Sequence, residues 1–162
     1  MIFEQAKNYV TRGNHCVYQI SYHVVLVTYK RKKVLTDEVS AFIIQSMGNV
    51  LSQWNGALLE AKADVDHIHL LISIPPKYSL STCIGTLKQV SAKLVRKEFY
   101  HMPQLSKNGR LWSSSFYVST VGEADMETVS RYIRLQGTDR RAGHPKRGDC
   151  IATRKPPLTS PP

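Results

Sequence analysis

The sequence predicts an α+β domain built on a ferredoxin-like or RRM-like β-α-β-β-α-β antiparallel sheet with one added C-terminal helix. Three observations support this fold class. Runs rich in β-branched and aromatic residues show the two-residue alternation of strands, while longer stretches space their apolar residues three and four apart, as helices do. Turn residues separate these segments, and 162 residues suit a single domain.

The first strand and the first helix occupy residues 17–29 and 36–54. Strand VYQISYHVVLVTY places its alternate residues on one face of the sheet: Ile20, Tyr22, Val24 and Leu26. The following helix has apolar residues from Val39 to Leu51 at helical spacing, and Thr36 is a suitable N-cap. Asn55-Gly56 then breaks the helical pattern.

Two further strands and a second helix follow. We expect strands at 57–65, ALLEAKADV, and 67–74, HIHLLISI, with Pro75-Pro76 ending the second. The helix should run from Ser79 to about Tyr100, with one apolar side and a polar, basic side. The apolar side consists of Leu80, Ile84, Leu87, Val90, Leu94 and Val95, and the polar side of Gln89, Lys93 and Arg96.

The last strand and last helix close the predicted domain, 1–137. A short strand is expected at 116–121, and the helix should begin near Asp125 and end at Gly137. Its stripe of Met126, Val129 and Ile133 predicts that it packs against another surface. Residues 138–162 contain five prolines, an excess of basic residues and no apolar periodicity, which predicts a basic, disordered tail.

Charge and cysteine content narrow the function classes. The chain has 22 Lys and Arg against 12 Asp and Glu, a formal net charge of +10, which favours a polyanionic partner such as nucleic acid. Cys16, Cys83 and Cys150 are widely spaced and include no Cys-x-x-Cys pair, which is typical of a reducing, cytoplasmic setting. No signal peptide and no long apolar run are expected, and hence no membrane.

Two short sequence patterns contain residues that could form a metal-binding or catalytic site. His67-Ile68-His69 lies inside a strand, so both imidazoles should share one face while Ile68 points to the other. Tyr132 and Gln136 are four residues apart and should share one side of the last helix. The plain alternatives are two half-exposed histidines on an open sheet, and an aromatic residue at the core edge beside a solvated glutamine.

Together with their surroundings, these patterns resemble a known family. The segments SYHVVLVTYKRKKVL, VDHIHLLISIPPKYSLSTCIGTLKQVSAKLV, LWSSSFYVSTVG and ETVSRYIRLQ, in that order, are similar to the single-tyrosine HUH transposases of the insertion-sequence 200/605 family. HUH stands for His, hydrophobic, His. The segment DHIHLL resembles the metal motif of that family, and YIRLQ resembles its Tyr-x-x-x-Gln helix. The resemblance covers about residues 18–136.

The resemblance implies a mechanism. His67, His69 and Gln136 are expected to bind a divalent cation, and Tyr132, on the added helix, to attack a DNA phosphate and form a 5′-phosphotyrosine. Two imidazoles and one amide oxygen leave coordination positions open, which suits Mg²⁺ or Mn²⁺ better than a closed tetrahedral zinc site. The expected substrate is single-stranded DNA with hairpins near the element ends. The expected assembly is a homodimer whose active sites can be shared between subunits.

Charge and helix face, rather than the motifs, suggest the DNA contacts. Four basic residues follow the first strand directly, and four more lie on the second helix. These candidates are Lys30, Arg31, Lys32, Lys33, Lys88, Lys93, Arg96 and Lys97. Each of them is also compatible with an ordinary solvated surface charge.

Three other functions fit parts of the pattern. A domesticated HUH nuclease that acts on repetitive palindromic DNA would share both motifs. A non-catalytic module could stack single-stranded nucleic acid on the open sheet without using the histidines. A His-x-His metalloenzyme for a small molecule is disfavoured by the basic charge and by the lack of a further histidine at a suitable strand position.

Overall fold

The computed structural model describes residues 10–13, 15–102, 110–122 and 126–135. Its elements follow the predicted order, preceded by a short hairpin. They are β1 (Thr11–Arg12), β2 (Val17–Tyr18), β3 (Ser21–Val27), the 3₁₀ turn η2 (Tyr29–Arg31), α1 (Asp37–Gln53), β4 (Ala57–Ala63), β5 (His67–Ser73), α2 (Leu80–Glu98), β6 (Tyr117–Val121) and α3 (Met126–Leu135). Asp125, Gly137 and the tail predicted at 138–162 lie outside the described residues.

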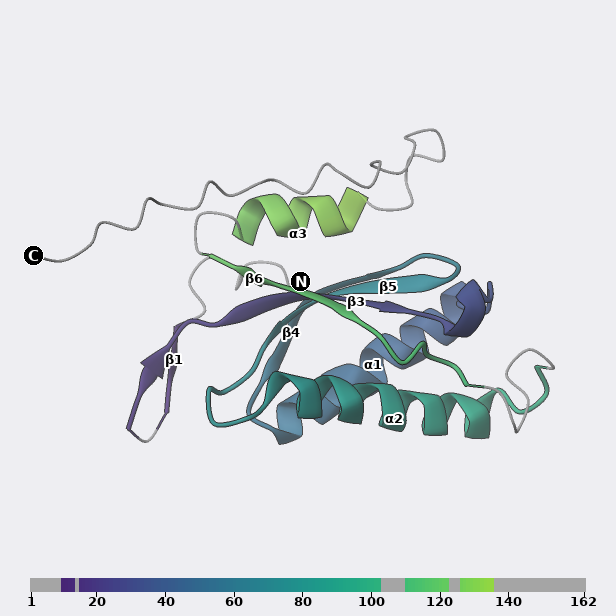
Figure 1. The fold of residues 1–162 in the computed structure, drawn as a ribbon, viewed down its shortest axis with the longest axis horizontal. Coiled ribbons are helices and arrows are strands. Elements are labelled where there is room, and N and C mark those ends of the chain that lie inside the picture. Colours follow the sequence, from purple (N-terminus) through teal and green to yellow (C-terminus); the bar gives the residue numbers. More distant parts are fainter. Residues whose placement is uncertain (1–9, 14, 103–109, 123–125, 136–162) are drawn as a thin grey trace, which may run out of the picture.

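The main sheet has the strand order β4-β5-β3-β6, and each of its three strand pairs is antiparallel. This is the order of a ferredoxin-like sheet, in which the first and third strands of the motif lie at the centre. Figure 1 shows α1 and α2 together on one face of the sheet and α3 on the other. The predicted fold class is therefore confirmed.

The predicted first strand is divided in the structure. Residues 17–18 pair with β1 in a separate hairpin, and only 21–27 belong to the main sheet. The strand also ends before Tyr29, because Lys30 and Arg31 adopt left-handed backbone conformations with φ of 56° and 52°. An alternating pattern marks residues that can form a strand, but it does not tell which neighbour they pair with.

The main core lies between the sheet and the helix pair. Its buried residues alternate along the two central strands, at Val24 and Leu26 on β3 and at Ile68, Leu70 and Ile72 on β5. The helices contribute buried side chains that include Ile43, Met47, Leu51, Ile84, Leu87 and Val95. Because every second side chain of these strands points into this core, the side chains between them point to the face that α3 covers.

The predicted boundaries of the first helix are confirmed by its cap. The Val39 amide donates to Thr36 Oγ1 over 3.3 Å at the N-terminus of α1. After the helix, Gly56 lies where a Cβ would be 2.7 Å from the Ser73 carbonyl oxygen, so a side chain there would clash with β5. In the described part of the chain, no helix is long and apolar enough to cross a membrane.

Candidate active site

Strand β5 presents His67 and His69 to the face that α3 covers. Ile68, between them, is fully buried in the main core, as the alternation predicts. The two imidazole centroids are 5.1 Å apart, with the rings nearly perpendicular. His69 is only 7% exposed, so at least one of the two predicted ligands is held in a protected position. The shared face of the pair is thus confirmed.

Asp66 and Arg31 fix the orientation of His67. His67 Nδ1 lies 2.6 Å from Asp66 Oδ1, and Arg31 donates to Asp66 Oδ2 over 3.1 Å. Burial raises the pKa of the Asp66 carboxyl, but the hydrogen bonds from His67 and Arg31 outweigh it, and the pKa is lowered overall. In the neutral ring, Nδ1–H of His67 donates this hydrogen bond to the carboxylate, and Nε2 of His67 carries the free lone pair. Metal-binding histidines characteristically have such a carboxylate partner.

His69 has a partner on the neighbouring strand. His69 is directly opposite Val25 in the β3–β5 register, and His23 is its diagonal neighbour on the same face. His23 Nε2 lies 2.9 Å from His69 Nδ1, and the two rings stack with centroids 5.2 Å apart. If Nδ1 of His69 donates this hydrogen bond, Nε2 of His69 is also left with a free lone pair.

Burial favours the neutral forms of the His69 and His23 rings. Burial, together with the neighbouring imidazoles His23 and His67, lowers the pKa of His69 to about 4, although Asp64 acts in the opposite direction. Burial also lowers the pKa of His23. A neutral imidazole is the form that binds a metal ion.

Helix α3 is held on the sheet by a small apolar cluster. Ile133 is fully buried against Leu71 and Val121, and Val129 packs on the same cluster. Burial of one such side chain contributes about 1.5–3 kcal/mol. The predicted apolar stripe is confirmed for Val129 and Ile133, whereas the side chain of Met126 is outside the described part.

Polar contacts fix the helix on the side of β4. Glu60 Oε2 accepts hydrogen bonds from Ser130 Oγ over 3.2 Å and from Arg134 Nε over 3.0 Å. Arg134 also donates to Ser130 Oγ over 3.0 Å. Apolar burial and this network together set the rotation of α3 about its axis.

This rotation brings Tyr132 to the histidines. The Tyr132 ring meets the His69 ring edge-on, with centroids 6.0 Å apart, and Tyr132 is 47% exposed. Tyr132, His67 and His69 are thus close together, although more than 60 residues separate the tyrosine from the histidines in the sequence. A partly exposed phenol beside two imidazoles is accessible to a phosphate from solvent.

The residues that are present fit a divalent cation in part. His67 and His69 share a face, and in the tautomers in which Nδ1 of each ring donates to its partner, both Nε2 atoms are available. The predicted third ligand, Gln136, lies outside the described residues. Among the described residues, no group of three or more His, Cys, Asp and Glu side chains is arranged to hold a metal ion. Two imidazoles with no thiolate beside them among the described residues suit an open coordination shell completed by oxygen ligands.

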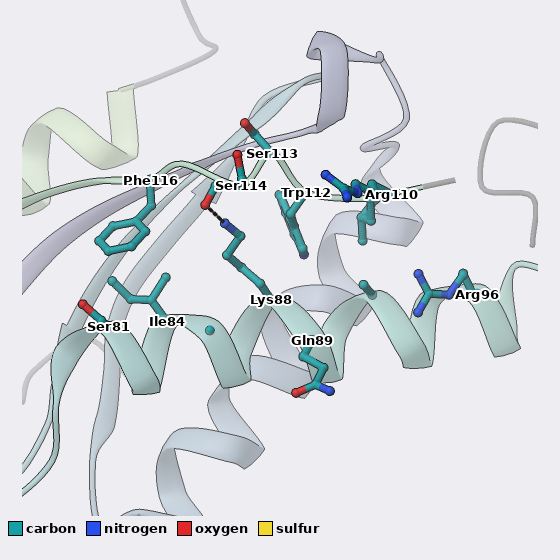
Figure 2. A pocket seen from close by; sticks show the side chains of 13 residues that line it. Ser81, Ile84, Lys88, Gln89, Arg96, Arg110, Trp112, Ser113, Ser114 and Phe116 are labelled. Atoms are coloured by element: carbon teal, nitrogen blue, oxygen red, sulfur yellow. Dashed lines mark hydrogen bonds between the residues drawn. The ribbon is translucent and has the colours of Figure 1, made fainter. Parts of the chain in front are cut away.

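The predicted DNA contacts fall into two regions. Lys30, Arg31, Lys32 and Lys33 follow β3 beside Asp66, at the histidine end of the sheet, and all four are exposed. Lys88, Lys93, Arg96 and Lys97 lie on α2, in the layer beneath the sheet. Lys88 differs from the others because its Nζ donates to the carbonyl oxygen of Ser114 (Figure 2) and to that of Ser115.

Three residues near the site were missed by the sequence reasoning. His23 contacts His69, Lys62 is directly opposite His69 in the β4–β5 register, and Tyr117 on β6 meets the His23 ring edge-on, with centroids 6.2 Å apart. Alternation alone predicts that His23 lies on the other face of the sheet from Tyr22 and Val24, which face the core. The partner of His23 depends on the strand register, which the sequence does not reveal.

Comparison with known proteins finds one family. A family model described as "Transposase IS200 like" matches residues 16–136. The transposase for insertion sequence element IS200 from Salmonella typhimurium is 31% identical over 130 residues, which cover 80% of this chain and 84% of the relative. The ISDra2 transposase TnpA from Deinococcus radiodurans is 30% identical over 128 residues, which cover 77% and 89% of the two chains.

Two solved structures share the fold. A crystal structure of a Deinococcus radiodurans protein described as a transposase superposes with a TM-score of 0.63 at 29% identity, covering 78% of this chain and 97% of that one. A REP-associated tyrosine transposase bound to a REP hairpin superposes with a TM-score of 0.53 at 13% identity, covering 79% and 68%. At that identity the second likeness concerns the fold alone.

Proposed function

The chain belongs to the IS200-like transposase family, and from this membership we propose that it cleaves and rejoins single-stranded DNA at the ends of a mobile element, with Tyr132 as the nucleophile. One observation carries the proposal. The Tyr132 ring lies against His69, on the face that also presents His67, with ring centroids 6.0 Å apart. Neither a structural tyrosine nor a surface histidine pair requires this association.

In the proposed reaction, the scissile phosphoryl group is transferred from the 3′-oxygen of the DNA to the phenol oxygen of Tyr132. The Tyr132 phenol loses its proton as Oη forms a bond to the scissile phosphorus. The bond from phosphorus to the 3′-oxygen breaks, and that oxygen takes up a proton to become a free 3′-hydroxyl. The 5′-phosphotyrosine retains the phosphoester, so rejoining by a 3′-hydroxyl needs no nucleotide cofactor.

A divalent cation, Mg²⁺ or Mn²⁺, fits the residues on this face. His67 and His69 would hold it through Nε2, with Gln136 as the third ligand that the family resemblance implies. When bound, it would offset negative charge on the scissile phosphate and favour the ionised phenol. Asp66 and His23 keep the two imidazoles oriented, since each engages the Nδ1 atom of one of them.

Basic residues at the same end of the sheet provide the phosphate contacts of the proposed site. Lys62 is directly opposite His69, and Arg31 is held beside His67 through Asp66. Exposed Lys30, Lys32 and Lys33 extend the positive surface outward from this point. A strand that brings its phosphate to Tyr132 therefore meets cations on either side of the histidines.

We extend the proposal to the partners. The substrate would carry hairpins near the ends, in agreement with the hairpin that is bound to the REP-associated structural relative. Two ends must be joined and each tyrosine holds one, so the active assembly would be a homodimer. The packing of α3 on its own sheet supports a site that is complete within one subunit.

The experiment is a covalent-adduct assay. The protein is incubated with Mg²⁺ or Mn²⁺ and a labelled hairpin oligonucleotide with single-stranded flanks from the element ends, and the products are separated on a denaturing gel. We expect a band of protein-linked DNA for the wild type and for Tyr100→Phe, which removes the hydroxyl of an exposed tyrosine outside the site. Tyr132→Phe should abolish this band.

Two results would overturn the proposal. An undiminished adduct in Tyr132→Phe would exclude this phenol as the nucleophile. The second result is a wild type that binds the DNA but forms no adduct, together with a His67→Ala variant that binds the DNA equally well. It would identify a binding module that makes no use of its histidines.

A further inference from the structure

A groove of about 530 Å³ lies between α2 and the segment 110–116, in the helix layer and away from the histidines. Ile84, Lys88 and Arg96 line it from α2, and Arg110, Trp112 and Phe116 line it from the opposite wall (Figure 2). Ile84 and Arg96 are 12 positions apart, so the helical wall extends for about 18 Å. We call this feature the α2 groove.

Positive charge dominates one end of the α2 groove. Arg96 and Arg110 are exposed, and neither has an ion-pair partner among the described residues. The described lining includes no carboxylate that could neutralise them. Two guanidiniums at one concave surface form a site for an anion with several oxygens, such as a phosphate.

Lys88 adds a fixed charge in the middle of the groove. Its Nζ donates to the carbonyl oxygens of Ser114 and Ser115, over 3.0 and 3.3 Å. An ammonium group has three donors, so one remains for a ligand. The two carbonyl contacts also hold the segment 114–115 against the helix, which gives the groove a fixed width.

Phe116 provides an aromatic surface at the other end. It is 37% exposed beside Ile84, and Lys88 Nζ lies 5.9 Å from the ring centroid (Figure 2). The next residue, Tyr117, is 55% exposed and contacts the ring of His23 on the histidine face. Two consecutive exposed aromatic residues therefore lie on either side of β6, an edge strand of the sheet.

This arrangement outlines a path from the histidine face to the groove. A chain that leaves Tyr132 can pass Tyr117, cross the edge at β6, stack on Phe116 and then continue to Lys88, Arg96 and Arg110. Alternation of aromatic surfaces and cations is the usual design for binding single-stranded nucleic acid. Paired bases of a duplex do not offer their faces for stacking, so Phe116 favours an unpaired strand.

We propose that the α2 groove binds a single-stranded segment of the substrate DNA that lies outside the cleaved phosphodiester, with a base on Phe116 and phosphates at Arg96 and Arg110. The inference rests on the proposed function for the identity of the DNA. It adds a second binding site, in the helix layer, that serves affinity and not the chemical step.

Fluorescence anisotropy tests the proposal. The probes are a hairpin oligonucleotide with single-stranded flanks, the same oligonucleotide with flanks trimmed to the nucleotides around the cleavage position, and a blunt duplex. We compare Arg96→Ala/Arg110→Ala with Arg12→Ala/Lys77→Ala, which removes two exposed positive charges outside the groove. Phe116→Ala is compared with Phe116→Tyr, which restores the aromatic face. Circular dichroism verifies the folding of each variant.

We expect the double arginine variant to bind the long-flank probe at least tenfold more weakly than the control pair. The slope of log affinity against log salt should fall by about 1.4, the value for two lost contacts to single-stranded phosphates. Phe116→Ala should weaken binding about five- to hundredfold, and Phe116→Tyr should bind like the wild type. With the trimmed probe, the groove variants should match the wild type.

Three results would overturn the proposal. The first is that the groove variants and the wild type bind the long-flank probe with equal affinity. The second is that the control pair loses as much affinity for this probe as the double arginine variant. The third is that the blunt duplex binds as tightly as the flanked hairpin. The adduct assay remains a separate readout. If the wild type forms an adduct but the groove variants bind DNA with normal affinity, only the role of the α2 groove is refuted. If binding depends on the groove but no adduct forms, only the proposed function is refuted.

Discussion

At the scale of single residues, the site depends on what occupies Nδ1 of each imidazole. Nδ1 of His67 is hydrogen-bonded to Asp66, and Nδ1 of His69 is hydrogen-bonded to His23. The aspartate is adjacent to its histidine in the sequence and belongs to the recognised motif. His23 is 46 residues away and is brought to His69 only by the antiparallel register of β3 and β5. Alternation predicts its face, but not its partner.

We therefore predict that His23 controls metal affinity. His23→Leu removes the hydrogen-bond partner of His69 Nδ1, and Mn²⁺ binding measured by titration calorimetry should weaken about 10- to 100-fold. His23→Gln places a side-chain oxygen near the same point and should recover most of the affinity. If His23→Leu binds Mn²⁺ as the wild type does, His23 does not orient the ligand.

A second residue-scale prediction concerns Cys83. Burial in the core raises the pKa of its thiol to about 11, from an ordinary 9.0. Above pH 9 the unfolded chain loses this proton while the folded chain keeps it, so the contribution of this group to stability declines as the pH rises from 9 towards 11. Urea unfolding at pH 8 and pH 10 should show a smaller loss in Cys83→Ser than in the wild type. An equal loss in both proteins would contradict this assignment.

At the scale of elements, α3 is the least securely attached part of the site. Its apolar contact with the sheet comprises Ile133, Val129 and their neighbours Leu59, Leu71 and Val121, whereas α1 and α2 share the large core. The apolar stripe in the sequence predicts that α3 packs on something. The surface that it covers could not be predicted, because Leu71 and Val121 come from strands that meet only in the folded sheet.

Loss of this contact should separate catalysis from global stability. Ile133→Ala removes a fully buried side chain and should release Tyr132 from the histidines, lowering the rate of adduct formation at least tenfold. The melting temperature should change little, because the main core is untouched. The matched control is Ile43→Ala in α1, which should lower the melting temperature by several degrees without lowering the adduct rate at a temperature where it is folded. The reverse pattern would show that α3 does not position the tyrosine.

The basic side of α2 shows the same limit of sequence analysis. Helical spacing correctly predicted that Lys93 and Arg96 face away from the core, and both are exposed. It could not predict that Lys88 donates to the backbone of the segment 114–115, because that contact joins residues 26 and 27 positions apart. Each predicted DNA contact therefore needs its own variant.

At the scale of the whole molecule, the sheet separates two functional faces. His67, His69 and Tyr132 lie together on the face that α3 covers, and the α2 groove lies in the helix layer on the other face. The element order, the fold class and the inward-facing residues of the strands could be predicted from strand alternation, helical spacing and the turn residues between the segments. The N-terminal hairpin could not, since residues 17–18 continue the alternating pattern of β3 but pair with β1 instead.

The assembly of the site in one or two subunits is testable by mixing. If Tyr132 serves the histidines of its own chain, dimers of Tyr132→Phe with His67→Ala contain one subunit that lacks the nucleophile and another that lacks a ligand, and neither subunit holds a complete site. The mixture should then form no adduct. Adduct formation after subunit exchange would show that α3 completes the site of the partner.

The central claim is that the phenol of Tyr132 becomes linked to DNA, and peptide mapping tests it most directly. Wild-type protein is incubated with the metal ion and the hairpin oligonucleotide, digested with protease and nuclease, and examined by mass spectrometry. We predict a nucleotide joined through its 5′-phosphate to Tyr132, in the peptide that contains residues 132–134. A link to another residue, or through a 3′-phosphate, would contradict the account.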